Sequence, residues 1–141
     1  MTSTRDVAES LYRAFLSGDK DGMLALMADD VDVRFLGQAR LAGKAEASRF
    51  MDFSAGLLTD VRFTLRHLVV DGYIAAGVWE ETARTASGEP WRNHGVDVIT
   101  VRDGLVVALH ENNDVRAVYR HFPAYAPTDP PTGLPEHRRT P

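Results

Sequence analysis

The chain has 141 residues, enough for one domain with a single core and too few for two domains of ordinary size. A hydrophobic content of 44% and a charged content of 26% are typical of a globular protein and argue against disorder. A net charge of -4 argues against nucleic acid or acidic lipid as a partner, and the lack of cysteine excludes disulfides, thiol nucleophiles and thiolate metal sites.

The N-terminal segment predicts a capped helix. Apolar residues recur at helical spacing from Val7 to Leu16, after a capping-box pattern formed by Ser3 and Asp6. Gly18 is expected to end this helix. The segment "MTSTRDVAES" lacks an apolar signal core, and no stretch reaches the ~20 apolar residues of a membrane span. We therefore expect a cytoplasmic protein without a membrane partner.

Two more helices and one strand are predicted before residue 54. Asp19 or Asp21 is placed to cap a short helix through "MLALM", and "VDVRFL" alternates as a short strand. Gly43 precedes a third helix through "KAEASRFMDF", whose aromatic residues are expected to help cover a sheet.

From Val61 onward the pattern changes to strands. The segments "VRFTLRHLVV", "YIAAGVWEETART", "NHGVDVITV" and "LVVALHEN" are rich in β-formers, and the "DG" pairs at residues 71–72 and 103–104 indicate hairpin turns. Helices followed by a meander predict an α+β domain, with helices packed on one face of a curved antiparallel sheet. Asp114 is expected to cap a closing helical turn from Val115 to Phe122. Residues 1–122 are the predicted domain, and six prolines make residues 123–141 an extended or disordered tail.

The order helix, "SGDKDGMLALMADDVDVRF", helix, long strands and "GVDVITVRDGLVV" resembles the nuclear transport factor 2-like superfamily over about residues 5 to 122. Its members include SnoaL-like polyketide cyclases, ketosteroid isomerase and limonene epoxide hydrolase. The resemblance implies a cone-shaped, cystatin-like roll whose helices and curved sheet enclose an apolar pocket. It also implies a homodimer through the other face of the sheet.

The resemblance places a catalytic carboxylate at Glu111 and a second one at Glu80. In epoxide hydrolases the first protonates the opening epoxide and the second orients water; SnoaL-like cyclases carry their acid/base aspartate near the first. The epoxide hydrolases also have an arginine two residues before the second acid, where this chain has Val78. Arg84 is expected on the same side of the strand as Glu80, from where it could supply this positive charge at a different position.

Asp97 is the third candidate acid. The segment "VDVITVRDG" resembles the isomerase segment whose aspartic acid stays protonated and donates to an enolate. The isomerase's general base, however, falls near Phe35, and its tyrosine aligns closer to Leu11 than to Tyr12. Only one of three isomerase residues is therefore matched, which argues against steroid isomerisation.

We expect Glu80, Asp97 and Glu111 to project from neighbouring strands into one apolar cavity. Desolvation and like charge disfavour ionising all three, so that one acid and one base can coexist there. Other readings are open: strand-end glutamates often pair with arginine, and Asp97 can instead pair with Arg66 or lie at a dimer interface. Trp79, with the parity opposite to Glu80, is assigned either to the outer face or to the core.

The remaining candidates are residues expected to bind the substrate. They are Tyr12, Phe15, Phe50, Trp91 and Asn113. His110 and Glu111 are expected to face opposite ways, and the histidines lack the spacing of a metal site. The predicted function is a cofactor-free, metal-free hydrolase, cyclase or isomerase acting on a polyketide- or terpenoid-like molecule. A non-catalytic binding or interaction module is the alternative.

Overall fold

A computed structural model describes residues 2–35 and 39–125 of the chain. Its elements follow one another as α1 (Thr4–Leu16), α2 (Lys20–Ala25), β1 (Met27–Phe35), β2 (Ala39–Ala42), α3 (Lys44–Ser54), β3 (Leu58–Asp71), β4 (Ile74–Thr85), β5 (Pro90–Arg102), β6 (Leu105–Asn113), α4 (Val115–His121) and the 3₁₀ turn η1 (Pro123–Tyr125). This order confirms the predicted α+β class. Beyond Tyr125, the predicted tail lies outside the described residues.

Side-chain caps fix where the helices begin. The Ser3 hydroxyl accepts a hydrogen bond from the Asp6 amide while the Asp6 carboxylate accepts one from the Ser3 amide, which confirms the predicted capping box. Asp19 caps α2 through the Gly22 amide, and Asp114 caps α4 through the Arg116 amide. Asp114 therefore has the structural role that the sequence predicted.

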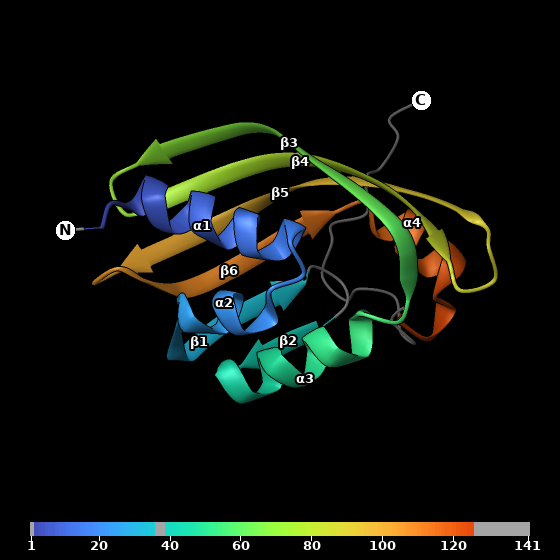
Figure 1. Cartoon of the computed structure of the whole chain (residues 1–141), viewed down its shortest axis with the longest axis horizontal. Helices are drawn as coiled ribbons and strands as arrows, with labels where there is room; N and C mark the ends of the chain where they lie inside the picture. The colour runs from blue at the N-terminus through green and yellow to red at the C-terminus, as the bar shows by residue number, and fades with distance from the viewer. Residues whose placement is uncertain (1, 36–38, 126–141) are drawn as a thin grey trace, which may run out of the picture.

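The strands form one curved, unclosed sheet of order β2-β1-β6-β5-β4-β3 (Figure 1). Strands β3 to β6 are the predicted antiparallel meander. Strand β1 runs parallel to β6, so the sheet is mixed rather than purely antiparallel. Strand β2 was not predicted, because four residues give too short a pattern to distinguish a strand from a loop.

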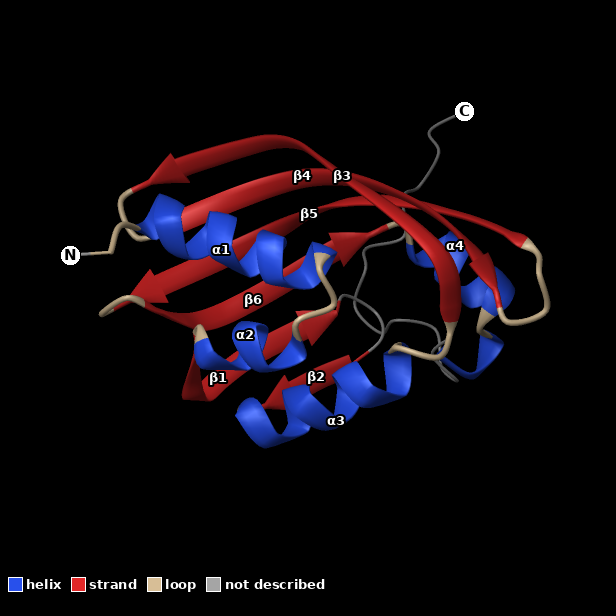
Figure 2. Ribbon diagram, in the orientation of Figure 1, coloured by secondary structure: helices blue, strands red, loops and turns tan. Residues whose placement is uncertain are grey.

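Helix α1 lies across the concave face of the sheet, while α2 and α3 lie near β1 and β2 (Figure 2). The buried core lies between these helices and that face, and consists of Val7, Ala8, Leu11, Tyr12, Met27, Val31, Val33, Ala47, Ala75, Ile99, Val101 and Val106. Helix α4 packs on β5 near the far end of the sheet (Figure 1). There Trp91 of β5 contacts His121 and Phe122, with ring centroids 5.6 Å apart in each case. The concave face between α1 and α4 carries the buried polar side chains described next.

Candidate active site

Two carboxyl side chains face each other across the centre of the sheet. Asp97 of β5 lies directly opposite Glu111 of β6. Residues directly opposite on antiparallel strands point to the same face, with Cβ atoms about 5 Å apart. On the other side of Glu111, the parallel strand β1 places Phe35 as its neighbour. The sheet register therefore brings together two of the three predicted acids and gives Glu111 an apolar neighbour.

Both oxygens of Asp97 accept hydrogen bonds from buried aromatic side chains. Tyr12 Oη donates to Oδ2 at 2.9 Å, and Trp79 Nε1 donates to Oδ1 at 3.0 Å. Asp97 is only 8% exposed, and within residues 2–35 and 39–125 it has no cationic partner. Two neutral donors thus stabilise this carboxylate inside the protein without neutralising its charge. The alternative in which Asp97 pairs with Arg66 is wrong, because Arg66 pairs with Glu80.

Two glycines let the aromatic donors approach Asp97. Gly77 of β4 lies opposite Asp97, and a Cβ atom built there would overlap Tyr12 Oη. Gly95 lies opposite Trp79, and a Cβ atom there would overlap the backbone carbonyl oxygen of Asn112 and lie 2.8 Å from the indole ring. Since real side chains do not approach this closely, only glycine leaves room for the two rings. The resemblance places the isomerase tyrosine closer to Leu11 than to Tyr12, but it is Tyr12 that reaches Asp97.

Glu111 has a different set of neighbours. Its Oε1 atom accepts a hydrogen bond from Asn113 Nδ2 at 2.9 Å, and the described residues provide no donor to Oε2. Asn113 lies two residues further along β6, on the same face of the strand. Its own carbonyl atom, Oδ1, is buried and has no partner within the described part of the chain. Glu111 is therefore less well solvated by the protein than Asp97.

Burial separates the acidities of this pair. Burial raises the pKa of Glu111 to about 8, and the negative charges of Asp97 and Glu81 add to that increase while the Asn113 hydrogen bond opposes it. Burial also raises the pKa of Asp97, to about 6, against the lowering effect of its hydrogen bonds from Tyr12 and Trp79. At neutral pH the pair thus holds one proton, favoured on Glu111, beside an ionised Asp97.

Glu81 is a third inward-facing acid that the sequence analysis missed. Trp91 Nε1 donates to Glu81 Oε1 at 2.8 Å, and burial raises the pKa of Glu81 above its ordinary value. Glu81 faces inward because it is two residues after Trp79 and side chains alternate along a strand. The large aromatic residue at position 79 was the signal in the sequence that could have identified this face.

The prediction that Glu80 shares a cavity with Glu111 is wrong. Its side chain is 56% exposed on the outer face, where Arg66 Nη2 contacts Glu80 Oε2 at 2.8 Å. The count based on the resemblance was one residue out of phase, which reverses the face of every side chain in β4. Of the two alternatives for Trp79, the outer face is wrong and the core is confirmed, since its side chain is buried. Arg84 is also exposed and donates to the Gly88 carbonyl instead.

The predicted substrate-binding residues occupy different environments. Phe50 of α3 packs on Phe35, with ring centroids 4.6 Å apart, and so lies on the side of Glu111 away from Asp97. Phe15 is 40% exposed at the end of α1, with its edge toward Phe63. Tyr12, Trp91 and Asn113 make the polar contacts described above. Their role in binding a substrate stays a prediction.

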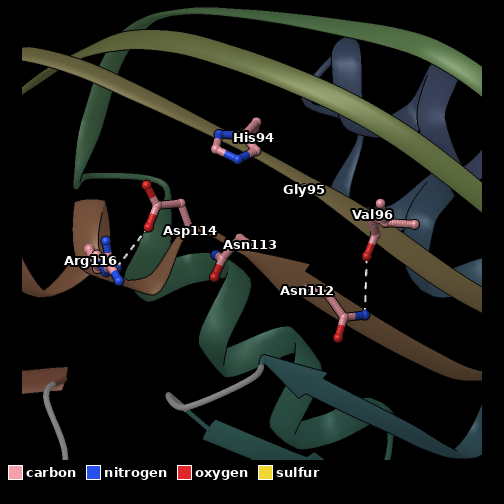
Figure 3. Close-up of a pocket in the computed structure, with 7 residues that line it drawn as sticks. All are labelled: His94, Gly95, Val96, Asn112, Asn113, Asp114 and Arg116. Carbon is pink, nitrogen blue, oxygen red and sulfur yellow. Dashed lines mark hydrogen bonds between the residues drawn. The ribbon is translucent and has the colours of Figure 1, made fainter. Parts of the chain in front are cut away.

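Two of the open hollows in the surface of the described residues are lined by neither Asp97 nor Glu111. One, of about 420 Å³, is lined by His94, Gly95, Val96, Asn112, Asn113, Asp114 and Arg116 (Figure 3). The other, of about 290 Å³, lies between α1 and α2. The rings of Tyr12, Phe63 and Trp79 stack against one another over the concave face near Asp97. These hollows therefore do not correspond to the enclosed apolar pocket that the sequence predicted.

Two further observations concern ligands and membranes. Within the described residues, no three His, Asp or Glu side chains are arranged to hold a metal ion. His110 faces the side opposite to Glu111, as expected, and its Nε2 atom lies 3.4 Å from Asp32 Oδ2. No helix in the described ranges is both long and apolar enough to cross a bilayer.

Comparison with known proteins relates this geometry to a family. Residues 8–109 match the model of the SnoaL-like domain. Comparison with curated proteins found no match. Three solved structures are similar to this chain. An NTF2-like protein of unknown function from Burkholderia pseudomallei has 19% identity and a TM-score of 0.78, over 85% of this chain and 97% of that chain. A Δ5-3-ketosteroid isomerase from a Mycobacterium species has 26% identity and a TM-score of 0.71, over 83% and 97%. An LEH-like epoxide hydrolase from Mycobacterium tuberculosis has 16% identity and a TM-score of 0.71, over 86% and 90%.

These neighbours include enzymes with different reactions and a protein of unknown function, so they support the fold more strongly than any one activity. The family match spans most of the chain, from within α1 to the middle of β6. The chain belongs to the SnoaL-like domain family.

Proposed function

We propose that the protein is an enzyme that uses Glu111 as a proton shuttle on a small hydrophobic molecule, of polyketide or terpenoid type. The supporting observation is that the two opposed carboxyls have unequal neighbours. Tyr12 and Trp79 both donate to Asp97, whereas Glu111 receives a single hydrogen bond. Such an arrangement gives one acid that keeps its proton at neutral pH and one neighbour that stays ionised.

In this proposal Glu111 gives its proton to a substrate oxygen, such as that of a carbonyl or an epoxide. The O–H bond of Glu111 breaks as the new O–H bond of the substrate forms, and the Asn113 amide stabilises the resulting carboxylate. Two adjacent carboxylates repel each other, so Glu111 then removes a proton from another atom of the same substrate. The acid is restored and the substrate is isomerised or cyclised.

Asp97 acts in this scheme through its charge. At 8% exposure, and with both oxygens already hydrogen-bonded, it is poorly placed to contact a substrate. Its negative charge raises the proton affinity of Glu111. Glu80 lies on the outer face and cannot be the second, water-orienting carboxylate of an epoxide hydrolase. Glu81 does face inward, where one of its oxygens accepts a hydrogen bond from Trp91. The proposed shuttle needs only Glu111, so isomerisation or cyclisation is the reaction that we propose.

The test is proton exchange on a simple carbonyl probe. We expect the wild-type protein to accelerate exchange of the α-hydrogens of 2-tetralone in D₂O, and Glu111→Gln to abolish the acceleration. Glu80→Gln is the matched control, since it removes an acid of the same type on the outer face of β4 and should leave exchange unchanged. Acceleration that survives Glu111→Gln would show that the proton shuttle is assigned wrongly.

A non-catalytic binding module is the second candidate, and the open hollow next to Asn113 favours it. This hollow, of about 420 Å³, is lined by neither Asp97 nor Glu111, so it can hold a molecule that contacts neither acid. A binding protein has no need for a proton on Glu111. Exchange of 2-tetralone no faster than in buffer, together with measurable binding of the same ketone, would favour this alternative.

We also propose that two copies associate through the outer face of the sheet. Val78, Val96 and Val98 face outward from the central strands, and all are partly exposed. The helices cover the opposite face, so a second chain is the simplest cover for this apolar surface.

A further inference from the structure

The most informative unused group in the structure is the carbonyl of Asn113. Its amide nitrogen is engaged by Glu111 Oε1, while Oδ1 is shielded from solvent and accepts no hydrogen bond within residues 2–35 and 39–125. Buried polar atoms nearly always have a partner, and a buried acceptor without one is destabilising. An exception beside a candidate acid therefore requires an explanation.

The neighbouring residues offer few donors. The residue opposite Asn113 on β5 is Gly95, which has no side chain. Trp79 Nε1 already donates to Asp97. Asn112, the preceding residue in the chain, points to the other face and donates to the carbonyls of Val96 and His110. The proton on Glu111 is the one that the proposed function gives to the substrate oxygen, so the donor to Asn113 Oδ1 in the complex is a water molecule or the bound ligand.

We propose that Asn113 Oδ1 accepts a hydrogen bond from a hydroxyl group of the substrate, and that the enzyme selects molecules with a hydroxyl close to the oxygen on which Glu111 acts. The inference rests on the proposed function, because it assigns a second contact to the same substrate. The nitrogen and oxygen of one amide share a carbon, so Glu111 and Asn113 Oδ1 are near enough for one small molecule to contact both.

The proposal has a chemical consequence for specificity. A ligand with a methyl group in place of the hydroxyl would leave Asn113 Oδ1 buried without a partner, whereas the hydroxyl removes that defect. Sites that hydrogen-bond a substrate hydroxyl discriminate strongly against analogues that lack it. The selected class is thus a largely apolar molecule with two neighbouring oxygen functions, such as a hydroxyketone or an enol.

The test measures equilibrium binding of matched probe pairs in which a methyl group replaces the hydroxyl: phenol and toluene, 2-naphthol and 2-methylnaphthalene, cyclohexanol and methylcyclohexane. We expect the wild-type protein to bind at least one alcohol about tenfold or more tightly than its methyl partner, and Asn113→Leu to remove the preference. In the side-chain amide region of the NMR spectrum, the Asn113 signals should shift with the alcohol and stay in place with the methyl compound.

Two further variants are controls for the effect of Asn113→Leu. Asn113→Asp keeps an acceptor oxygen at this position and should keep the preference, which separates loss of the acceptor from loss of folding. Asn112→Leu changes the adjacent amide on the other face and should also keep it. A preference that persists in Asn113→Leu, or is absent from every pair in the wild type, would overturn the proposal, since water alone would then satisfy the carbonyl.

This experiment is independent of turnover. If Glu111 is not a proton shuttle, the exchange of 2-tetralone fails while the alcohol preference can still be present. If Asn113 does not bind a hydroxyl, the preference fails while exchange can continue. The two proposals can therefore be rejected separately.

Discussion

Asp97 and Glu111 lie opposite each other on adjacent strands, but only Asp97 has a hydrogen bond to each of its carboxyl oxygens. The difference comes from the neighbours on the Asp97 side, where two glycines admit the rings of Tyr12 and Trp79. On the Glu111 side the neighbour is Phe35, which offers no donor. A pair of similar groups thus acquires unequal acidities, and three of the four predictions below concern this pair.

The first prediction concerns the pH dependence of stability. Burial raises the pKa of folded Glu111 from 4.5 to about 8, so the folded protein keeps a proton that the unfolded chain releases between these values. The contribution of Glu111 to the free energy of unfolding should therefore be highest below pH 4.5 and should fall as the pH rises toward 8. Asp97 contributes in the same direction between 3.8 and about 6.

Glu111→Gln removes this titrating group. The free energy of unfolding of the variant minus that of the wild type should therefore increase from pH 4.5 to pH 8. Urea unfolding of both proteins across this range measures the difference, in which the contributions of all other groups largely cancel. If the difference between wild type and Glu111→Gln is the same at pH 4.5 and pH 8, Glu111 has an ordinary pKa in the folded protein.

Adjacent glutamates provide the second prediction. Glu81 faces the site and its charge contributes to the raised pKa of Glu111, whereas Glu80 is exposed and paired with Arg66. Glu81→Gln should lower the pKa of Glu111 and keep the hydrogen bond from Trp91, because an amide oxygen can still accept it. Glu80→Gln should leave that pKa unchanged. Carbon-13 NMR of the labelled Glu111 carboxyl reports both values, and equal effects of the two variants would contradict the assigned faces.

How far the sequence specified this site can be judged from these same residues. The caps at Ser3 and Asp114, the "DG" turns and the long strands were predictable because each depends on neighbours within a few residues. Asp97 and Glu111 were found through the resemblance. The face on which Glu80 lies was predicted wrongly, because an error of one residue along a strand moves every side chain to the opposite face of the sheet.

Two features of the site could not be predicted from the sequence for another reason: the Tyr12–Asp97 contact and the Asn113 carbonyl without a hydrogen-bond partner among the described residues. The contact joins residues 85 positions apart and depends on the absence of a side chain at Gly77. In a single sequence, a glycine within a strand indicates only that the strand is weakened there. The second is a property of packing around one atom. Patterns of hydrophobicity carry no information about either.

The third prediction concerns the hydrogen bond from Tyr12 to Asp97. Tyr12→Phe leaves Oδ2 of the buried carboxylate without its donor, which should reduce the free energy of unfolding at pH 7 by about 1–3 kcal/mol. The pKa of Asp97 should also rise, because the Tyr12 hydrogen bond lowers it. Tyr73→Phe is the control, since Tyr73 is 56% exposed at a turn. Equal stability of the two variants in chemical unfolding would show that the Tyr12–Asp97 bond contributes nothing.

The fourth prediction concerns association through the outer face of the sheet. Val98 lies near the middle of that face, between Ala76 and His110 on the adjoining strands. A lysine there would bring one charge from each copy into an apolar interface, where desolvation without a partner is costly. We expect the wild-type chain to sediment as a dimer at micromolar concentration and Val98→Lys to sediment as a monomer with native circular dichroism.

Leu16→Lys is the control for that experiment, because Leu16 is already 56% exposed at the end of α1, on the helical side of the sheet. This variant should remain a dimer, since it adds the same charge away from the proposed interface. A wild-type monomer at micromolar concentration would refute association through this face. A dimer that Val98→Lys leaves intact would place the interface elsewhere, and the exposed valines on the outer face would then need a different partner.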